Sequence, residues 1–381
     1  MSKRSLVTIL VLARLLEPVG AVVYAQRTGT PAYIPLPTPV VTIGAEGDPD
    51  YEFATIGAAL HLPTGNIAVA DWRTPGIRVY DASGRLIRTL GRSGAGPGEF
   101  RAVYDLFLAG DTLIAYDWHL RRLTRFLASG VLVSVQSVQP AAEDGPVDLV
   151  GRLPGGRWLV TTPHSPSWTH GHGVYRDTLR VGTIRPSSTG PVRWVGAFPG
   201  LSIFAYMPGQ DKTQWVVGPL AVAATGLAAA LGDTVVVGDT GVPELRYFLA
   251  DGRPLGRIPI AVEAPSGLRP QLKAARDEAL AQTAGQVNQA YIQAQYEASR
   301  QIPRYRDFTV ASDHRLWIRL FEERPTDSTH YLVIDAAGGV RARVSLPPRS
   351  RVLSVHAPWV LVALRNADDV EQVGAIRWVT P

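Results

Sequence analysis

The sequence predicts an all-β fold, a six-bladed β-propeller of four-stranded antiparallel blades, with a helical insertion between blades 4 and 5. Three observations predict this fold class. A strand-like run recurs along the chain, a glycine turn follows several of these runs at a fixed offset, and an early strand matches what the last unit lacks. Four-stranded units of about 40–50 residues are typical of propeller blades.

The recurring run is a short apolar strand, and most copies end in a polar residue. It occurs at 66–71, 112–117, 157–162, 234–239, 315–320 and 360–365. Successive runs end 46, 45, 77, 81 and 45 residues apart. Three intervals agree to within one residue, so the two longer ones predict insertions between blades, at roughly 199–218 and 264–303.

A glycine turn follows the run at a constant distance. Gly84, Gly130 and Gly252 each lie 13 residues after it, and Gly338 repeats the turn after a longer loop. Glycine supplies the positive φ that a tight hairpin needs. Residues on both sides of these turns alternate between apolar and polar, as in half-buried antiparallel strands. Each unit therefore reads as four strands, with the recurring run second.

The last unit, 351–380, has material for only three strands. Its fourth, outer strand is predicted to be Val40–Ile43, near the other end of the chain. Pairing the two ends in one blade would remove free sheet edges, which are prone to aggregate.

The first 25 residues have the pattern of a secretory signal. Lys3 and Arg4 precede an apolar run at 6–13, and Val23 and Ala25 place small residues where a signal peptidase cuts. The predicted domains are a signal peptide at 1–25, a linker at 26–38 and the propeller at 39–381. The protein is thus expected to be exported, periplasmic or extracellular, with no transmembrane segment after cleavage.

Composition narrows the function classes. The chain has no cysteine, which excludes disulfides and thiolate metal sites, and its formal net charge is +5. Only three of the 38 basic residues are lysine, a skew typical of a GC-rich genome, so the charge is weak support for an anionic partner. We expect no nucleic-acid partner, because the chain is predicted to be exported.

The segment 91–100, GRSGAGPGEF, follows the strand and turn of the first unit. It closely resembles the blade junction of NHL-repeat propellers, and the stretch from Thr42 onward resembles secreted bacterial six-bladed β-propeller proteins. The resemblance is strong over 40–138 and 306–380 and weaker between them. It implies the fold and an extracytoplasmic location. It implies no single function, because such propellers include scaffolds, sensors, RNA-binding domains, lyases and lactone hydrolases.

Large polar and aromatic residues gather in the predicted loops between the second and third strands. Such loops on a rigid scaffold favour binding residues. The candidate ligand-binding residues are Trp72, Arg73, Trp118, His119, Arg121, Arg122 and His164. The arginines favour an anionic or carboxylate ligand, and the two tryptophans can stack on an apolar or sugar-like part. The alternative is a solvated rim with no ligand.

Two further residue sets have a chemical and a structural interpretation. His164, His170 and His172 are weak candidates for a divalent metal site, although no nearby carboxylate supports them. Asp71, Asp117 and Asp239 recur at one position of the repeat. Recurrence favours a structural role for them, with the carboxylate accepting hydrogen bonds from the following loop.

The second insertion has helical spacing. Apolar residues recur every three or four positions between Pro270 and Arg300, with no proline inside. We expect this helix to pack over the loop-bearing face and limit access to the channel. The alternatives are a partner-binding element or padding on the rim.

The function that these features favour is an extracytoplasmic propeller that binds a small molecule, glycan or protein at the channel face, without assigned catalysis. The alternative is a metal-assisted hydrolase or lyase with its site over the channel. No cofactor is predicted apart from a divalent metal in that alternative, and we expect a monomer.

Overall fold

The computed structural model describes residues 32–163, 172–186, 190–207, 216–220, 222–262, 272–273, 276–277, 279–281, 286–299, 302–321 and 327–379. By its contacts the chain divides into residues 1–32 and residues 33–381. All the described strands and helices lie in the second unit. The predicted signal peptide and residues 26–31 of the predicted linker lie outside the described residues.

The described residues form six sheets of four or five strands and a small two-stranded sheet. In chain order, the first sheet holds β3 (Ile56–His61), β4 (Ile67–Asp71), β5 (Thr74–Tyr80) and β6 (Leu86–Leu90). The second holds β9 (Val103–Ala109), β10 (Thr112–Asp117), β11 (Arg122–Leu127) and β12 (Leu132–Ser137). The third holds β13 (Asp148–Arg152), β14 (Trp158–Thr161), β15 (Gly173–Ile184), β16 (Arg193–Tyr206) and β17 (Val216–Pro219).

The fourth sheet holds β18 (Gly226–Leu231), β19 (Thr234–Asp239), β20 (Glu244–Leu249) and β21 (Pro254–Pro259). The fifth holds β1 (Ile34–Pro35), β22 (Tyr305–Val310), β23 (Leu316–Leu320), β24 (Thr329–Ile334) and β25 (Val340–Leu346). The sixth holds β2 (Val41–Ile43), β26 (Arg351–His356), β27 (Trp359–Arg365) and β28 (Glu371–Arg377). The two-stranded sheet pairs β7 (Arg92–Ser93) with β8 (Glu99–Phe100).

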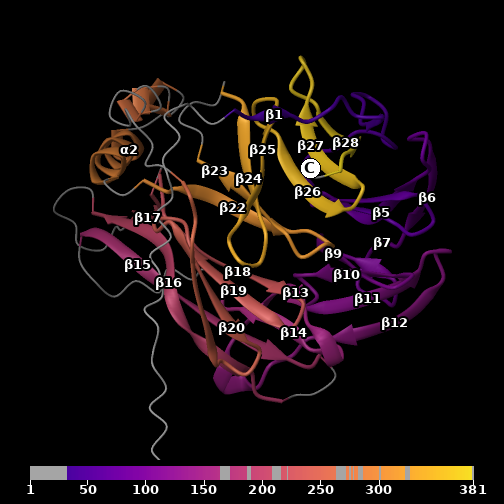
Figure 1. The fold of residues 1–381 in the computed structure, drawn as a ribbon, viewed down its shortest axis with the longest axis horizontal. Helices are drawn as coiled ribbons and strands as arrows, with labels where there is room; N and C mark the ends of the chain where they lie inside the picture. The colour runs from indigo at the N-terminus through magenta and orange to yellow at the C-terminus, as the bar shows by residue number, and fades with distance from the viewer. Residues whose placement is uncertain are drawn as a thin grey trace, which may run out of the picture. The chain divides into compact units, whose positions relative to one another are not determined.

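The sheets are joined into a closed series by their hydrophobic cores. One cluster of buried side chains lies between each pair of consecutive sheets, and another joins the sixth sheet back to the first. The first strands of consecutive sheets also contact one another, for example β3 with β9 and β18 with β22. In Figure 1 the yellow C-terminal strands accordingly lie beside the indigo first sheet. This arrangement is that of a β-propeller, with the first strands nearest the centre.

The six recurring runs are the second strands of the six sheets, as predicted. A second strand is covered on both faces by neighbouring sheets, and β4 is buried along its whole length. Strands buried on both faces have nearly continuous apolar sequences. The outer strand β12 is instead largely exposed or half-buried, which explains why second strands are the clearest sequence signal.

The predicted closing strand is confirmed. β2 pairs antiparallel with β28, with Thr42 opposite Gly374, and Ile43 is 1% exposed. A second N-terminal strand was not predicted: β1 pairs in parallel with β25, on the outer edge of the fifth sheet. The residues before the first sheet thus complete one sheet and extend another.

Most described residues of the insertion predicted at 199–218 belong to the third sheet. Residues 199–206 continue β16 and pair with β15, and β17 then adds a fifth strand. β15 and β16 are 12 and 14 residues long. This hairpin runs past the end of β14, whose residues Trp158–Thr161 pair only with residues 181–184 of β15.

A helix follows the fourth sheet in the chain. α2 (Gln286–Ala298) lies within the predicted helical segment, between β21 and β22 in sequence. Two short 3-10 turns, η1 (Ala142–Asp144) and η2 (Pro154–Gly156), flank β13. No helix in the described part of the chain is long and apolar enough to span a membrane.

Candidate functional site

The turns between second and third strands lie at one end of the sheets, together with the starts of the first strands, because the strands alternate in direction. Ile56, for example, lies opposite Asp71, and Val103 lies opposite Asp117. This shared end, which we call the loop end, carries the predicted ligand-binding residues that the structure describes.

Asp71 and Asp117 fasten the loop end together. Asp71 accepts hydrogen bonds from the backbone N–H groups of Ala54, Thr55 and Arg73 at 3.0–3.2 Å. The fully buried Asp117 accepts from Arg101, Ala102 and Leu120 at 2.7–3.4 Å. Each carboxylate therefore ties the start of a first strand to the turn after the second. These contacts confirm the structural interpretation of both residues.

Asp239 differs from its two counterparts. In the fourth sheet, the backbone N–H of Thr225 corresponds to the Thr55 N–H that binds Asp71 in the first sheet. It donates to the hydroxyl of Thr240 at 2.8 Å and not to Asp239. Asp239 keeps one hydrogen bond to its turn, from Gly241, and lies 3.1 Å from the guanidinium of Arg176 in the long hairpin. Its carboxylate therefore also links the third and fourth sheets.

Three aromatic rings line up across the loop end of the first two sheets. Trp72 stacks on Tyr104 with ring centroids 4.7 Å apart, and Tyr104 lies 5.8 Å from Trp118. His119 packs edge-on against Trp118 at 4.9 Å. Trp72 is 43% exposed, so the row presents aromatic surface to solvent. We call Trp72, Tyr104 and Trp118 the aromatic platform.

Local contacts fix the two indoles of the aromatic platform. A Cβ atom on Gly57 would lie 2.2 Å from Nε1 of Trp72, so the absence of a side chain at Gly57 lets the indole lie on the β3 backbone. Trp118 donates a hydrogen bond of 2.6 Å from Nε1 to the carboxylate of Asp148 on β13. Aromatic side chains held in one orientation lose little entropy when a ligand stacks on them.

The Asp148 carboxylate that binds Trp118 acts on a second carboxylate, Asp105, and on the hydroxyl of Tyr116. Asp105 and Tyr116 are directly opposite each other on β9 and β10, and Tyr116 packs into the cluster between the second and third sheets. Desolvation by the surrounding protein, and then the charge of Asp148, raise the pKa of Asp105 to about 6. The residue is nevertheless exposed to water. We call Asp105 and Asp148 the carboxylate pair.

The predicted arginines are not equivalent. The Arg122 guanidinium donates to the carbonyl oxygens of Ala95, Gly96 and Glu99, and so holds the segment that resembles an NHL junction. Arg73 is exposed beside Trp72. Arg121 has a left-handed φ of 47° in the turn that follows Trp118. The structure therefore brings Arg73 and Arg121 to the loop end but engages Arg122 in the scaffold.

The predicted histidine site is only partly visible. His164 and His170 lie outside the described residues. His172 packs its ring against Phe204 and Tyr206, with centroids 5.6 and 5.3 Å away. Within the described ranges, no group of three or more His, Cys, Asp or Glu side chains is placed to hold a metal ion.

Helix α2 packs on the outer part of the third sheet. Tyr291 lies 5.8 Å from Phe204 of β16, and Gln295 donates to the carbonyl of Pro219 at the end of β17. In Figure 1, α2 lies beside β17 at the periphery of the unit. The expectation that the helix covers the channel is therefore wrong for α2, because its apolar partner is the added fifth strand and the long hairpin.

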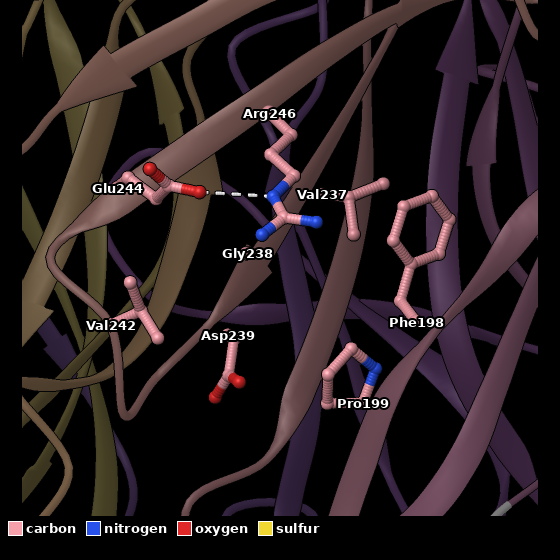
Figure 2. A pocket seen from close by; sticks show the side chains of 8 residues that line it. All are labelled: Phe198, Pro199, Val237, Gly238, Asp239, Val242, Glu244 and Arg246. Atoms are coloured by element: carbon pink, nitrogen blue, oxygen red, sulfur yellow. Dashed lines mark hydrogen bonds and ion pairs between the residues drawn. The ribbon is translucent and has the colours of Figure 1, made fainter.

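Two cavities lined by described residues lie apart from the aromatic platform. One, of about 210 Å³, lies between the fourth and fifth sheets and is lined by Thr225, Thr240 and Arg306 among others. The other, of about 30 Å³, has room for about one water molecule. Figure 2 shows it, with the Arg246 guanidinium hydrogen-bonded to Glu244 near Phe198.

Comparison with known proteins supports the fold. No protein-family model and no curated protein match the chain. A member of the DUF4221 family from Bacteroides vulgatus is 10% identical, with a TM-score of 0.53, and the match covers 90% of this chain and 97% of that one. At this identity the likeness concerns the fold alone.

Two other solved structures are more distant. A "Putative exported protein" from Bacteroides fragilis is 12% identical, with a TM-score of 0.47, over 89% of this chain and 94% of its own. Regucalcin, a calcium-binding protein from Agrobacterium tumefaciens, is 11% identical, with a TM-score of 0.44, over 92% and 98%. The resemblance to NHL-repeat propellers stays a prediction.

Sequence reasoning missed four residues of this region: Tyr104, Asp105, Tyr116 and Asp148. Tyr104 and Asp105 lie at the start of a first strand, where the register shifts between β9 and β10. One signal was available, since Asp105 is a carboxylate within the otherwise apolar run of β9. The partnership with Asp148 depends on how two sheets face each other, which sequence spacing does not show.

Proposed function

We propose that this protein is an exported six-bladed β-propeller that binds a ligand at its loop end without catalysing a reaction. The six sheets would be its blades, and 264–303 a helical insertion between blades 4 and 5. Export is inferred from the signal-like residues 1–25. N-terminal sequencing of exported protein should find a start near Gln26, and an intact Met1 would contradict export.

The aromatic platform is the observation that carries the binding proposal. A row of three adjoining rings, of which Trp72 and Tyr104 are stacked and Trp118 is tilted against Tyr104, offers apolar surface on a rigid scaffold and is held in place at Gly57 and Asp148. Aromatic residues with this exposure and fixation are typical of binding hot spots. The residues that surround it come from three consecutive sheets, as expected for a site at a propeller face.

The platform also changes the expected ligand chemistry. The sequence favoured an anionic ligand because of Arg73, Arg121 and Arg122. Because Arg122 is bound to backbone carbonyls, the positive charge available to a ligand at the loop end is smaller than predicted. The carboxylate pair adds negative charge next to Trp118. The ligand is therefore not expected to be a simple anion.

The proposal is tested by screening small molecules against the mature protein by thermal shift, followed by calorimetry on the hits. Trp72→Ala and Trp118→Ala should each weaken a true ligand by about tenfold, because truncating an aromatic hot spot costs more than about 1 kcal/mol. Trp359→Ala is the matched control. Trp359 stacks on His61 at 5.1 Å in the hairpin between β26 and β27, at the opposite end of the sheets.

Unchanged affinity in both platform variants, measured on folded protein, would contradict the proposal. The proposal would also be contradicted if Trp359→Ala weakened ligand binding as much as the platform variants did. Binding would then depend on general stability rather than on the loop end.

A further inference from the structure

The carboxylate pair and Tyr116 form a polar group between the second and third sheets. Asp105 and Tyr116 are cross-strand neighbours in register, so their side chains leave the sheet on the same face. That face packs on the third sheet, because Tyr116 shares a cluster with Leu149 and Trp158. Asp148, the first residue of β13, adds its carboxylate from the facing sheet.

The hydroxyl of Tyr116 has no hydrogen-bond partner among the described residues, although the residue is only 1% exposed. Burial and then the charge of Asp148, with a smaller contribution from Asp105, raise the pKa of Tyr116. Of these two residues, Asp105 is directly opposite Tyr116 on the neighbouring strand, and Asp148 is bonded to Trp118, two residues after Tyr116. Buried polar groups in folded proteins are nearly always hydrogen-bonded, and an exception calls for an explanation. A bound ligand that completes the group is one such explanation.

Asp105 is the carboxylate of this group whose charge is unpaired among the described residues. Asp105 has no hydrogen bond or ion pair there, and its carboxylate repels that of Asp148. Among the described residues, Arg121 is the cation whose charge lowers the pKa of Tyr116. The charge of Asp117 also acts on Tyr116, but the Asp117 carboxylate already accepts from three backbone N–H groups. Two neighbouring carboxylates favour either a shared proton or a bound cation.

Aromatic faces adjoin the carboxylates. Trp118 is anchored to Asp148 through its Nε1 atom, and its ring adjoins Tyr104. A cation over an aromatic face gains electrostatic attraction from the ring in addition to its attraction to carboxylates. Carboxylates beside aromatic rings thus suit an organic ammonium group, which has both charge and apolar surface. A calcium ion instead takes six to eight oxygen ligands.

We propose that Asp105, Asp148 and Tyr116 form a subsite for the ammonium group of the ligand, whose apolar part stacks on the aromatic platform. This inference rests on the proposed function, because it assigns the charge of the ligand that the platform binds. The carboxylates accept the ammonium N–H groups, and the Tyr116 hydroxyl gains a polar partner. The ligand class is an amine with an aromatic or similarly flat apolar portion.

A matched set of probes tests the charge requirement. Phenethylamine, phenethyl alcohol and hydrocinnamate carry a similar phenyl-alkyl portion and differ in having a positive, neutral or negative end. Each is titrated by calorimetry into the mature protein and into Asp105→Asn, Asp148→Asn and Tyr116→Phe, at neutral pH and low ionic strength. Asp111→Asn, an exposed carboxylate in the turn between β9 and β10, is the matched control.

Phenethylamine should bind about tenfold or more tightly than phenethyl alcohol, and hydrocinnamate most weakly, because a charge-assisted hydrogen bond is about twice as strong as a neutral one. Asp105→Asn and Asp148→Asn should each remove about tenfold of the amine affinity and leave the alcohol nearly unchanged. Tyr116→Phe should also weaken binding of the amine more than that of the alcohol, but by a smaller factor. Asp111→Asn should change neither affinity. NMR titration should also show that phenethylamine lowers the pKa of Asp105, since a cation favours the ionised form.

The outcomes separate this inference from the proposed function. Equal binding of amine and alcohol, both weakened by Trp118→Ala, would overturn the ammonium subsite and leave the platform. Amine binding that needs Asp105 but is indifferent to Trp72 and Trp118 would overturn the platform and leave the subsite. Absence of binding by phenethylamine at millimolar concentration, or its displacement by micromolar calcium, would overturn the subsite.

Discussion

Replacing Ile43 by alanine should destabilise the whole sheet assembly, although Ile43 lies in a strand of only three residues near the start of the described chain. Its side chain is 1% exposed and belongs to the cluster that joins the sixth sheet to the first. The substitution removes three carbon atoms. At about 0.8 kcal/mol each, their transfer to water costs about 2.4 kcal/mol, and the cavity left behind raises the total to about 3 kcal/mol.

Val40→Ala is the matched control. Val40 is 64% exposed and contributes its backbone N–H to Ala375 at 2.8 Å, which alanine preserves. Its substitution should change the free energy of unfolding by no more than about 0.5 kcal/mol. Chemical denaturation followed by circular dichroism compares both variants with the wild type.

A loss below about 0.5 kcal/mol for Ile43→Ala, with an unchanged denaturant slope, would refute the reasoning. It would mean that β2 does not form part of the cooperative unit and that closure does not depend on the N-terminal strand. A lower denaturant slope would instead indicate that the sixth sheet unfolds separately from the rest.

Three further predictions follow from buried or crowded charges. Asp117→Ala should destabilise the protein by about 3 kcal/mol or more, since three backbone N–H groups lose their acceptor. In chemical denaturation, a loss similar to that of the exposed control Asp111→Ala would contradict the role given to Asp117. Arg122→Ala should loosen residues 95–99, which hydrogen exchange would show as faster exchange there than in Arg73→Ala; equal exchange would refute the scaffold role. The pKa of Asp105 is raised to about 6, so the folded state holds a proton that the unfolded state loses, and stability falls as pH rises from about 4 to 6. Asp105→Asn should therefore melt higher than the wild type at pH 7 but not at pH 3, and a lower melting temperature at pH 7 would contradict this.

The sequence predicted the parts of the fold that repeat. The second strands were visible because they are buried on both faces and read as apolar runs. The closing strand was visible because the last unit lacked one. By contrast, the sequence did not reveal the extension of β15 and β16, because a strand that continues past its sheet has no turn residues where it leaves the sheet. β1 was missed because two paired residues leave no pattern.

The candidate site could be predicted only where a single residue type was informative. Trp72 and Trp118 attracted notice as large aromatic residues in loops, and the structure brings them together through Tyr104. Arg122 attracted notice for its charge, but a guanidinium satisfies carbonyls of a glycine-rich turn as readily as it binds an anion. The carboxylate pair joins two sheets, and such contacts between sheets need the three-dimensional arrangement.

Crystallographic screening of the mature protein with a library of small aromatic, amine and carboxylate fragments tests the central claim most directly. The account predicts that bound fragments gather on the aromatic platform, with amines placed so that the nitrogen lies within hydrogen-bond distance of Asp105 or Asp148. Fragments gathered in the cavity lined by Thr225 and Arg306, with none on Trp72, Tyr104 or Trp118, would contradict it.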